Sequence, residues 1–369
     1  MANDAASTAT GSAGRPADAR LLHDDCLVVD GLQIARWEPS VFRDMHAAGI
    51  TAATCTCSVW EGFRDTMTNI AAFQRWFLDH EDIIRPVRTV ADIHAAKAEG
   101  RVGIVLGFQN IHSIEDRLEY LGLFKALGVG VIQLTYNTQN LVGAGCYESR
   151  DGGLTDFGRD AVAEMNRVGI VVDLSHVGAN TAREAIEAST KPVVYSHTAP
   201  AALHPHPRNK TDEDMRRVAD GGGLVGVTLF PPFLAAGNEA TVADYVTAIE
   251  HVVNVVGEDH ACIGTDFIDG HDSTYLSWLN HDKGDGRPIG DPGLIDALVN
   301  VRMPRGIERI AAWPNITQTM LERGWPEERM RKVLGGNWLR LFDEVWPASP
   351  GPSDRLPTTD HQDREKSNG

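Results

Sequence analysis

The sequence predicts an α/β fold, specifically a (β/α)8 TIM barrel, and three observations support this. A chain of 369 residues with 42% hydrophobic residues suits one α/β barrel with insertions. Short runs rich in β-branched residues alternate along it with segments of helical periodicity. The main alternative for such alternation is a doubly wound open sheet. That fold is disfavoured because no Gly-x-Gly-x-x-Gly follows the first apolar run.

The barrel elements can be assigned in order from this alternation. Strands are expected at residues 26–29, 51–57, 102–108, 129–135, 170–174, 193–195, 223–228 and 262–265. Helices are expected between them at 63–78, 90–99, 114–127, 157–167, 180–189, 211–220 and 243–256. After the last strand, a Gly/Asp/Pro-containing loop at 271–304 could form a lid over the mouth, and 307–346 forms a C-terminal helical extension.

The two ends of the chain differ in composition from the part between them. Residues 1–20 are rich in Ala, Ser, Thr and Gly, and residues 348–369 likewise lack apolar periodicity. Such segments cannot bury enough apolar surface to offset the entropy of ordering. We therefore expect disordered tails at 1–20 and 348–369, with a single barrel domain at 21–347.

Charge and targeting signals restrict the partners. The formal charge of -17 would repel nucleic acid and anionic membranes, so a small soluble substrate is favoured. The sequence shows neither a signal-peptide h-region nor a transmembrane run. Its five cysteines are an odd number without zinc-finger spacing, which is typical of a reducing compartment and predicts a cytoplasmic protein. Association into a homo-oligomer is left open.

A repeated Ser-His dipeptide is the main candidate for a site. His176 and His197 each follow a serine at the end of successive predicted strands, with one amphipathic helix between them. In a parallel barrel both side chains would fall at the C-terminal ends of neighbouring strands, where loops converge and imidazoles can reach one metal ion. Each histidine taken alone could instead be a hydrogen-bonded loop residue.

Other polar residues are expected just after the strands and would line the same mouth. They are Asp30, Gln33, Ser58, Trp60, Glu61, Gln109, Asn110, Tyr136, Asn137, Asp266 and Asp269. Ser58, Asn110 and Asn137 are interpreted as helix caps or loop ties. Asp266 directly follows an apolar run, and a charged carboxylate there needs a metal, a histidine or water as a partner.

Four segments of the chain carry a resemblance to a known family. DLSHV, VVYSHTAPAALHPHPRN, IGTDF and GGNWLRLFDEVW are similar to the corresponding segments of the membrane (renal) dipeptidase family, a branch of the metal-dependent amidohydrolase barrels, and the resemblance covers about residues 21–346. That family hydrolyses dipeptides at a binuclear zinc site. The resemblance implies that His176 and His197 serve one metal position, that Arg208 grips a substrate carboxylate and that Asp266 is the catalytic aspartate.

The chain departs from the family pattern where the other metal would bind. Residues 30–34 read Asp-Gly-Leu-Gln-Ile in place of Asp-Gly-His-Asn-Asp, so leucine and isoleucine replace two ligands. Gln109 stands where a bridging glutamate is expected, and Tyr136 stands where a substrate-contacting histidine is expected. We therefore expect at most one divalent metal ion, Zn²⁺ or another, held by His176 and His197 with Asp266 or water.

These expectations combine into a predicted hydrolase that cleaves a C–N bond, amide or peptide, in a small substrate such as a dipeptide or another carboxylate. Asp266 would be the general base, and Tyr136 would donate to the developing oxyanion. Arg208, Asn209, Gln109 and Tyr136 would bind the substrate. Arg208 could instead anchor a helix N-terminus. The alternatives are a metal-free barrel acting as a binding or scaffold protein, and a lyase or isomerase of small-molecule catabolism.

Overall fold

The computed structural model describes residues 19–289 and 300–346, which form a parallel barrel. Neighbouring strands pair in the order β1, β2, β4, β5, β6, β7, β8 and β9, all parallel. Their bounds are Val29–Gln33, Ala52–Ser58, Val102–Phe108, Val129–Gln133, Val171–Asp173, Val194–Thr198, Leu224–Val227 and Ala261–Ile263. A further strand, β3 (Ile84–Pro86), pairs with β4 beside the barrel.

The barrel closes between its first and last strands. Gln33 forms a parallel bridge with Phe267, the amide of Ile34 donates to the Phe267 carbonyl at 2.9 Å, and the amide of Asp266 donates to the Leu32 carbonyl at 2.9 Å. These bonds continue the parallel ladder from β9 back to β1. The prediction of a (β/α)8 barrel is confirmed, and the open-sheet alternative is wrong.

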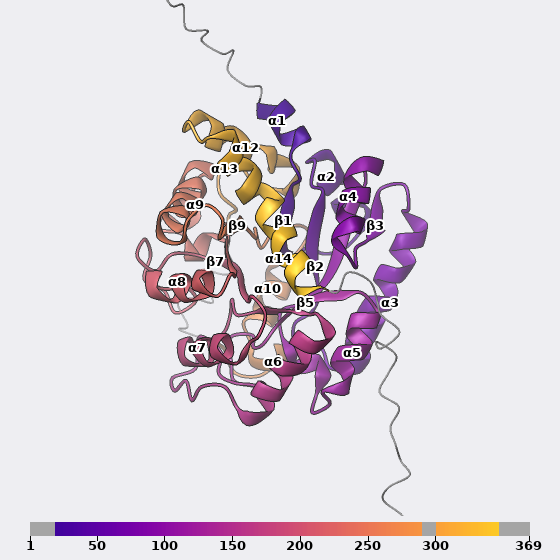
Figure 1. Ribbon diagram of the computed structural model, residues 1–369, viewed down its shortest axis with the longest axis vertical. Coiled ribbons are helices and arrows are strands. Elements are labelled where there is room, and N and C mark those ends of the chain that lie inside the picture. Colours follow the sequence, from indigo (N-terminus) through magenta and orange to yellow (C-terminus); the bar gives the residue numbers. More distant parts are fainter. Residues whose placement is uncertain (1–18, 290–299, 347–369) are drawn as a thin grey trace, which may run out of the picture.

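Helices surround the sheet and connect the strands (Figure 1). Their bounds are α1 Ala19–Asp25, α2 Pro39–Ala47, α3 Phe63–Asp79, α4 Val90–Glu99, α5 Glu119–Ala126, α6 Asp156–Val168, α7 Ala179–Ala188, α8 Asp212–Asp220, α9 Val242–Val256, α10 Ser273–Leu279, α12 Pro314–Glu322, α13 Glu327–Arg331 and α14 Asn337–Val345. Threonines at 89, 211 and 241 begin α4, α8 and α9 with capping boxes, which satisfy exposed amides of the first turn. None of the described helices meets the length and hydropathy needed to cross a membrane.

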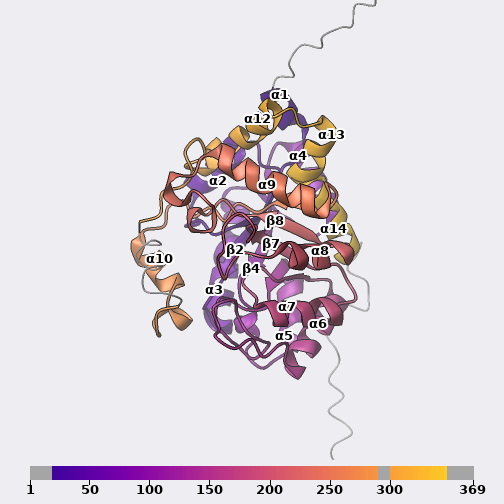
Figure 2. The same cartoon turned by 90° about the vertical axis from the view of Figure 1, so that its left-hand side faces the viewer.

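Different elements cover the two ends of the barrel. At the N-terminal ends of the strands, an apolar layer that includes Val29, Val131 and Cys262 packs against Trp338 and Phe342 of α14. At the opposite end, the side chains of α10 pack over the mouth. Figure 2 shows α10 and α14 on opposite sides of the barrel. The site therefore lies at the end covered by α10.

Element boundaries differ from the sequence prediction in a few places that affect the site. The strand 102–108 and the helix 90–99 were predicted correctly. The first strand was expected at 26–29 but lies at Val29–Gln33, so Asp30 and Gln33 are inside the strand. His197 was expected just after its strand but lies within β7. The predicted strand ended too early because Asp30 and Gly31, a charged residue and a glycine, resemble a turn in the sequence. In the structure the Asp30 carboxyl group is buried and its hydrogen-bonding capacity is met by other residues.

The elements that were not predicted include α1, α2, β3 and α10, the last of which lies within the expected loop 271–304. Residues 290–299 of that loop lie outside the described residues. The predicted tails also lie outside them, except that α1 begins at Ala19 within the expected N-terminal tail.

Candidate active site

The two predicted histidines meet at the mouth of the barrel. His176 lies three residues after β6, His197 lies within β7, and both are buried. Their Nε2 atoms are 3.0 Å apart. Tyr136, which follows β5, stacks on the His176 ring with 4.2 Å between ring centroids. The parallel barrel thus brings together three residues that are far apart in the sequence.

Hydrogen bonds fix the protonation of each imidazole. The Ser196 hydroxyl donates its single proton to the Asp173 carboxylate at 2.5 Å, so the Nδ1 atom of His197, 2.7 Å from that hydroxyl, carries the proton of their bond. His176 Nδ1 lies 2.6 Å from the side-chain oxygen of Asn137 and donates to it. Burial lowers the pKa of both histidines, which keeps them neutral.

It follows that both Nε2 atoms are unprotonated and that their lone pairs converge. Two lone pairs facing one another at 3.0 Å repel unless a cation lies beside them. Neutral imidazoles held through Nδ1 are the usual form of histidine metal ligands. His176 and His197 can therefore hold a metal. Within residues 19–289 and 300–346, no three His, Cys, Asp or Glu side chains are grouped closely enough to complete such a site.

Asp266 faces the same space as His176. It follows β9 with φ of 60°, an uncommon backbone conformation for a non-glycine residue. Burial raises the pKa of its carboxyl to about 7, although the Arg208 guanidinium opposes this rise. Asp266, His176, Tyr136 and Asn137 line a small cavity of only about 30 Å³.

Arg208 is fully buried, and its described hydrogen bonds anchor no helix N-terminus. Its terminal nitrogens donate to the backbone carbonyls of Ser175 at 2.7 Å and His197 at 2.5 Å. These bonds hold the two histidine-bearing segments together. Its Nε atom is buried without a partner among the described residues. The neighbouring Asn209 donates from its amide to the carbonyls of His204 and Phe233, and its side-chain oxygen has no described partner.

The part of the mouth formed by β1 and β4 lacks ligands. Leu32 and Ile34 are buried. The Gln109 amide donates to the Thr56 hydroxyl at 3.1 Å. Asp30 accepts hydrogen bonds from the Thr265 amide and hydroxyl, from the Trp313 indole and from the Gln33 side-chain amide. Its carboxyl oxygens are therefore engaged by other residues of the fold. Among the described residues, these four side chains therefore leave no unengaged carboxylate or imidazole at this part of the mouth.

The remaining residues that were expected at the mouth are spread over several local structures. Asn110 caps the short helix η1 (Ile111–Ile114), as expected. The Ser58 hydroxyl bonds to Thr66, Glu61 accepts from the Val59 amide, and Asp269 accepts from the Ile310 amide. Trp60 packs edge-on against Tyr136, at 5.2 Å between ring centroids.

Several contributors to the site were not predicted as such. Asn137 was interpreted as a loop tie, yet it orients His176. Its φ of 62° is a conformation that Asn tolerates, and this property is the one sequence signal that could have identified it. Asp173 and Ser196 were not assigned a role, although Ser196 is the serine of one Ser-His pair and Asp173 lies two residues before the other pair. Leu276 and Leu279 of α10 form the roof, and no local sequence pattern indicates this role.

The fold and the site define a TIM-barrel protein with paired, metal-compatible imidazoles at the C-terminal ends of its strands. The family "Membrane dipeptidase (Peptidase family M19)" matches residues 39–282. The chain belongs to this family, which confirms the resemblance seen in the sequence.

Related sequences support this assignment. The chain is 31% identical over 307 residues to "Dipeptidase aclJ" of Aspergillus oryzae, covering 82% of this chain and 66% of that protein. It is 30% identical over 297 residues to "Dipeptidase tcpJ" of Claviceps purpurea, covering 80% of this chain and 63% of that protein. The chain therefore spans slightly less than two thirds of the length of these relatives.

Solved structures share the fold. A Pseudomonas aeruginosa protein described as an amidohydrolase is 52% identical, with a TM-score of 0.86 over 89% of this chain and 99% of that chain. A Rhodobacter sphaeroides metallo peptidase, liganded with a phosphinate mimic of the dipeptide L-Ala-D-Ala, is 20% identical, with a TM-score of 0.71 over 87% of this chain and 100% of that one. At that identity the second likeness concerns the fold alone.

Proposed function

We propose that the protein is a dipeptidase-like hydrolase that cleaves a C–N bond in a small soluble substrate with the help of one divalent metal ion, Zn²⁺ or another. The observation that carries the proposal is the pair of neutral imidazoles whose Nε2 lone pairs converge at 3.0 Å. Membership of the dipeptidase family supplies the class of reaction. The proposal includes a cytoplasmic location. All five cysteines are free thiols and four of them are buried, which is consistent with a reducing compartment.

His176 and His197 would hold the ion, and water would complete its coordination; Asp266 is not grouped closely enough with the two histidines and would join only by moving toward them. Lewis acidity is what a bound divalent ion supplies at such a site: it polarises the scissile carbonyl and acidifies water toward neutral pH. A second ion is not part of the proposal, because Leu32 and Ile34 have no donor atoms and Gln109 is a neutral amide.

Asp266 is the proposed general base. A carboxyl with a pKa of about 7 is poised to take a proton from the attacking water near neutral pH. Tyr136 lies in the same cavity, and burial raises the pKa of its phenol well above the ordinary value. Its hydroxyl therefore stays protonated and can donate a hydrogen bond to the oxygen that becomes negative in the transition state.

Arg208 is the proposed partner of a substrate carboxylate. Its Nε donor is buried without a described partner, and burial in a dry site strengthens a charge-assisted bond. Asn209 and Gln109 would contact the substrate beside it. Because the free space of about 30 Å³ is far smaller than a typical small-molecule site of roughly 300–1,000 Å³, substrate entry would require the α10 side chains Leu276 and Leu279 to move aside.

Metal content and turnover test the proposal together. Elemental analysis of the purified protein should find about one divalent ion per chain, and a panel of dipeptides should be hydrolysed only when that ion is present. Two ions per chain would contradict the interpretation of β1 and β4. No metal and no turnover across the panel would instead favour a barrel that binds small molecules without hydrolysing them.

A further inference from the structure

The walls of the small cavity beside His176 are largely apolar and carry little negative charge. The apolar side chains that line it are Ile34, Phe230, Phe233, Ile268, Leu276 and Leu279. Among the described residues, Asp266 is the one carboxylate in these walls. A substrate that reaches His176 therefore meets mainly apolar groups and a single acid.

The order of the strands places apolar side chains on both sides of Asp266. This residue follows β9, which lies between β8 and, through the bonds that close the barrel, β1. Ile34 follows β1, whereas Phe230 and Phe233 follow β8. A substrate whose scissile bond lies beside Asp266 therefore has one half toward Ile34 and the other half toward the two phenylalanines.

The two apolar sides differ in what lies next to them. The Arg208 guanidinium lies over the Phe233 ring, with 5.5 Å between its central carbon and the ring centroid. Ile34 instead packs into an apolar cluster with Trp60 and Leu276. If Arg208 pairs with the substrate carboxylate, the half that bears this carboxylate lies at Phe233. The other half, which in a dipeptide bears the α-ammonium, then lies at Ile34.

The side formed by Ile34 offers no carboxylate to an ammonium among the described residues. Asp30 is engaged by hydrogen bonds from other residues, and so is Glu61. An ammonium held by Asp266 would lower the pKa of this carboxyl and so weaken it as the proposed base. A free dipeptide would therefore bring an ammonium into a buried apolar environment without a partner, which is unfavourable.

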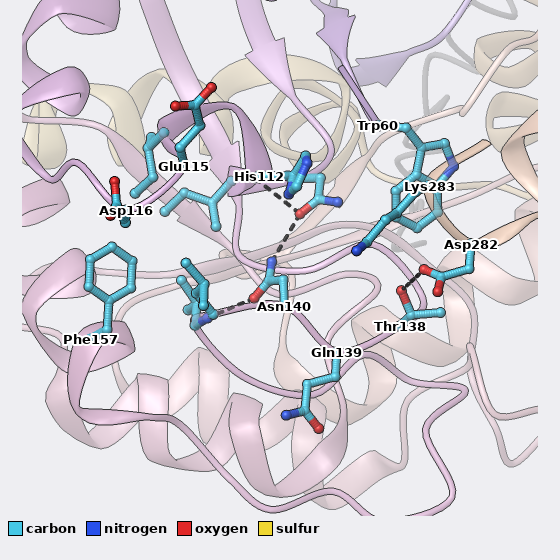
Figure 3. Close-up of a pocket in the computed structure, with 15 residues that line it drawn as sticks. Trp60, His112, Glu115, Asp116, Thr138, Gln139, Asn140, Phe157, Asp282 and Lys283 are labelled. Atoms are coloured by element: carbon cyan, nitrogen blue, oxygen red, sulfur yellow. Dashed lines mark hydrogen bonds between the residues drawn. The ribbon is translucent and has the colours of Figure 1, made fainter. Parts of the chain in front are cut away.

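A neighbouring cavity of about 410 Å³ contains further carboxylates, but Trp60 separates it from the site (Figure 3). Trp60 lines this larger cavity, while its ring packs edge-on against Tyr136 of the small one. Figure 3 shows Glu115 and Asp116 on the side of the larger cavity away from Trp60. None of the described residues lines both cavities, so these carboxylates are not placed to receive an ammonium of the substrate.

Buried positive charge beside the histidines disfavours an ammonium as well. Arg208 and Lys210 are both buried. Arg208 donates to the Ser175 carbonyl at 2.7 Å, and Lys210 donates to the Val177 carbonyl at 2.6 Å, so the two cations hold the residues on either side of His176. A bound divalent ion would add to this charge. Such a field favours a substrate that has a carboxylate and lacks an ammonium.

We propose that the preferred substrates are N-acyl amino acids with two apolar halves, rather than dipeptides with a free ammonium. The inference rests on the proposed hydrolysis at this site and names its substrate class. The acyl chain lies against Ile34 and Leu276, the amino-acid side chain lies against Phe230 and Phe233, and the carboxylate pairs with Arg208. In the reaction the C–N bond breaks, the acyl carbon takes the water oxygen and leaves as a carboxylate, and the nitrogen takes both water protons and leaves as the ammonium of the free amino acid.

Two isosteric compounds test the proposal. N-propionyl-L-leucine has a methyl group where glycyl-L-leucine has its ammonium, and hydrolysis releases leucine from both. The metal-loaded protein should hydrolyse the propionyl compound with a kcat/KM at least about tenfold higher near neutral pH, because its acyl group needs no charged partner. Equal or higher efficiency on glycyl-L-leucine would overturn the inference and leave the proposed hydrolysis intact.

A carboxylate introduced on the apolar side should change the preference. Ile34→Asp should shift the ratio of the two efficiencies toward glycyl-L-leucine roughly ten- to a hundredfold, because it supplies a partner for the ammonium. Ile34→Asn is the matched control, since asparagine has the size of aspartate without its charge, and its shift should be much smaller. Equal shifts in the two variants would contradict the assignment of the ammonium to this side.

Binding measured without turnover separates this inference from the proposed hydrolysis. Asp266→Asn removes the proposed base, and calorimetric titration of this variant should show that N-propionyl-L-leucine binds roughly tenfold or more tightly than glycyl-L-leucine. Absence of hydrolysis of both compounds by the wild type would overturn the proposed hydrolysis. In that case tighter binding of the propionyl compound would still support an uncharged group at Ile34, and equal or weaker binding would overturn it.

Discussion

The two halves of the barrel mouth have the same kind of buried scaffold but different outer residues. Under β6 and β7, Asp173 accepts hydrogen bonds from Ser175 and Ser196, and these segments end in two imidazoles. Within β1, Asp30 is equally buried and accepts hydrogen bonds from Thr265 and Trp313.

In that second half, however, the residues above the aspartate are Leu32 and Ile34. Ile34 packs into an apolar cluster with Trp60 and Leu276. The comparison teaches that a parallel barrel positions side chains at its mouth whatever their chemistry. The side chains themselves decide whether a metal can bind, and the half formed by β6 and β7 is the one that we propose to bind it.

The strongest test of the comparison removes one imidazole. His176→Ala or His197→Ala should abolish metal binding and reduce turnover on the order of 10³-fold, because a single imidazole cannot retain the ion. Metal content and activity are measured together. Circular dichroism should show an intact barrel. A variant that keeps its metal would show that the metal binds at another place in the protein.

A second test concerns the buried charge of Asp266. Its folded pKa of about 7 lies above the ordinary value, so the folded state binds a proton that the unfolded chain releases between about pH 4 and 7. The stability associated with this proton is present at acid pH and is lost as the pH rises through 7. Asp266→Asn should therefore raise the free energy of unfolding of the metal-free protein by about 2–4 kcal/mol at pH 8.

That gain should vanish near pH 3, below the ordinary pKa of about 3.9, where the carboxyl is largely protonated in both states. Urea titrations of wild type and variant at the two pH values provide the measurement. A gain of the same size at both would mean that the carboxyl does not titrate as described.

Arg208→Lys tests whether the guanidinium grips a substrate carboxylate. A charge-assisted pair is worth roughly 1.5–3 kcal/mol, so catalytic efficiency should fall roughly ten- to more than a hundredfold on a substrate with a free carboxylate. On the amide of the same substrate, the variant's loss of catalytic efficiency should be much smaller. Equal losses on both would show that the bonds of Arg208 to the Ser175 and His197 carbonyls are its whole role.

Matched changes of the two buried aspartates test the scaffold directly. Asp173→Asn should lower metal affinity roughly 10- to 100-fold, because Asp173 orients His197 through Ser196. Asp30→Asn should leave metal affinity unchanged, although it weakens the bonds to Thr265 and Trp313. Isothermal titration with Zn²⁺ measures both variants, and a comparable loss in Asp30→Asn would mean that the two halves are not independent.

The smallest expected effect is the gain of a second, weak site. Leu32→His, Ile34→Asp and Gln109→Glu together should add one equivalent of divalent metal, because they supply donors where the barrel already positions side chains. Its affinity should be low, since two carboxylates are placed among buried apolar groups. Metal content that stays at one equivalent would show that these positions do not face a common point.

The sequence by itself determined the barrel, most of its elements and the residues most worth testing. Periodicity of apolar residues is a local property, so β4 and α4 could be placed from their own residues. The Ser-His pairs and Asp266 were found because parallel strands all present their C-terminal ends to one mouth. The same reasoning identified Leu32 and Ile34 as residues that cannot bind metal.

Only the tertiary structure decided how these residues are held. The contact of Asn137 with His176, the bonds of Arg208 to two backbone carbonyls and the cover formed by α10 join segments that lie far apart in the chain. Such contacts depend on strand register and loop paths, and both follow from packing across the whole barrel. The shift of β1 to Val29–Gln33 has the same cause, because Asp30 can lie within a strand only when Thr265 and Trp313 are in place to bond to it.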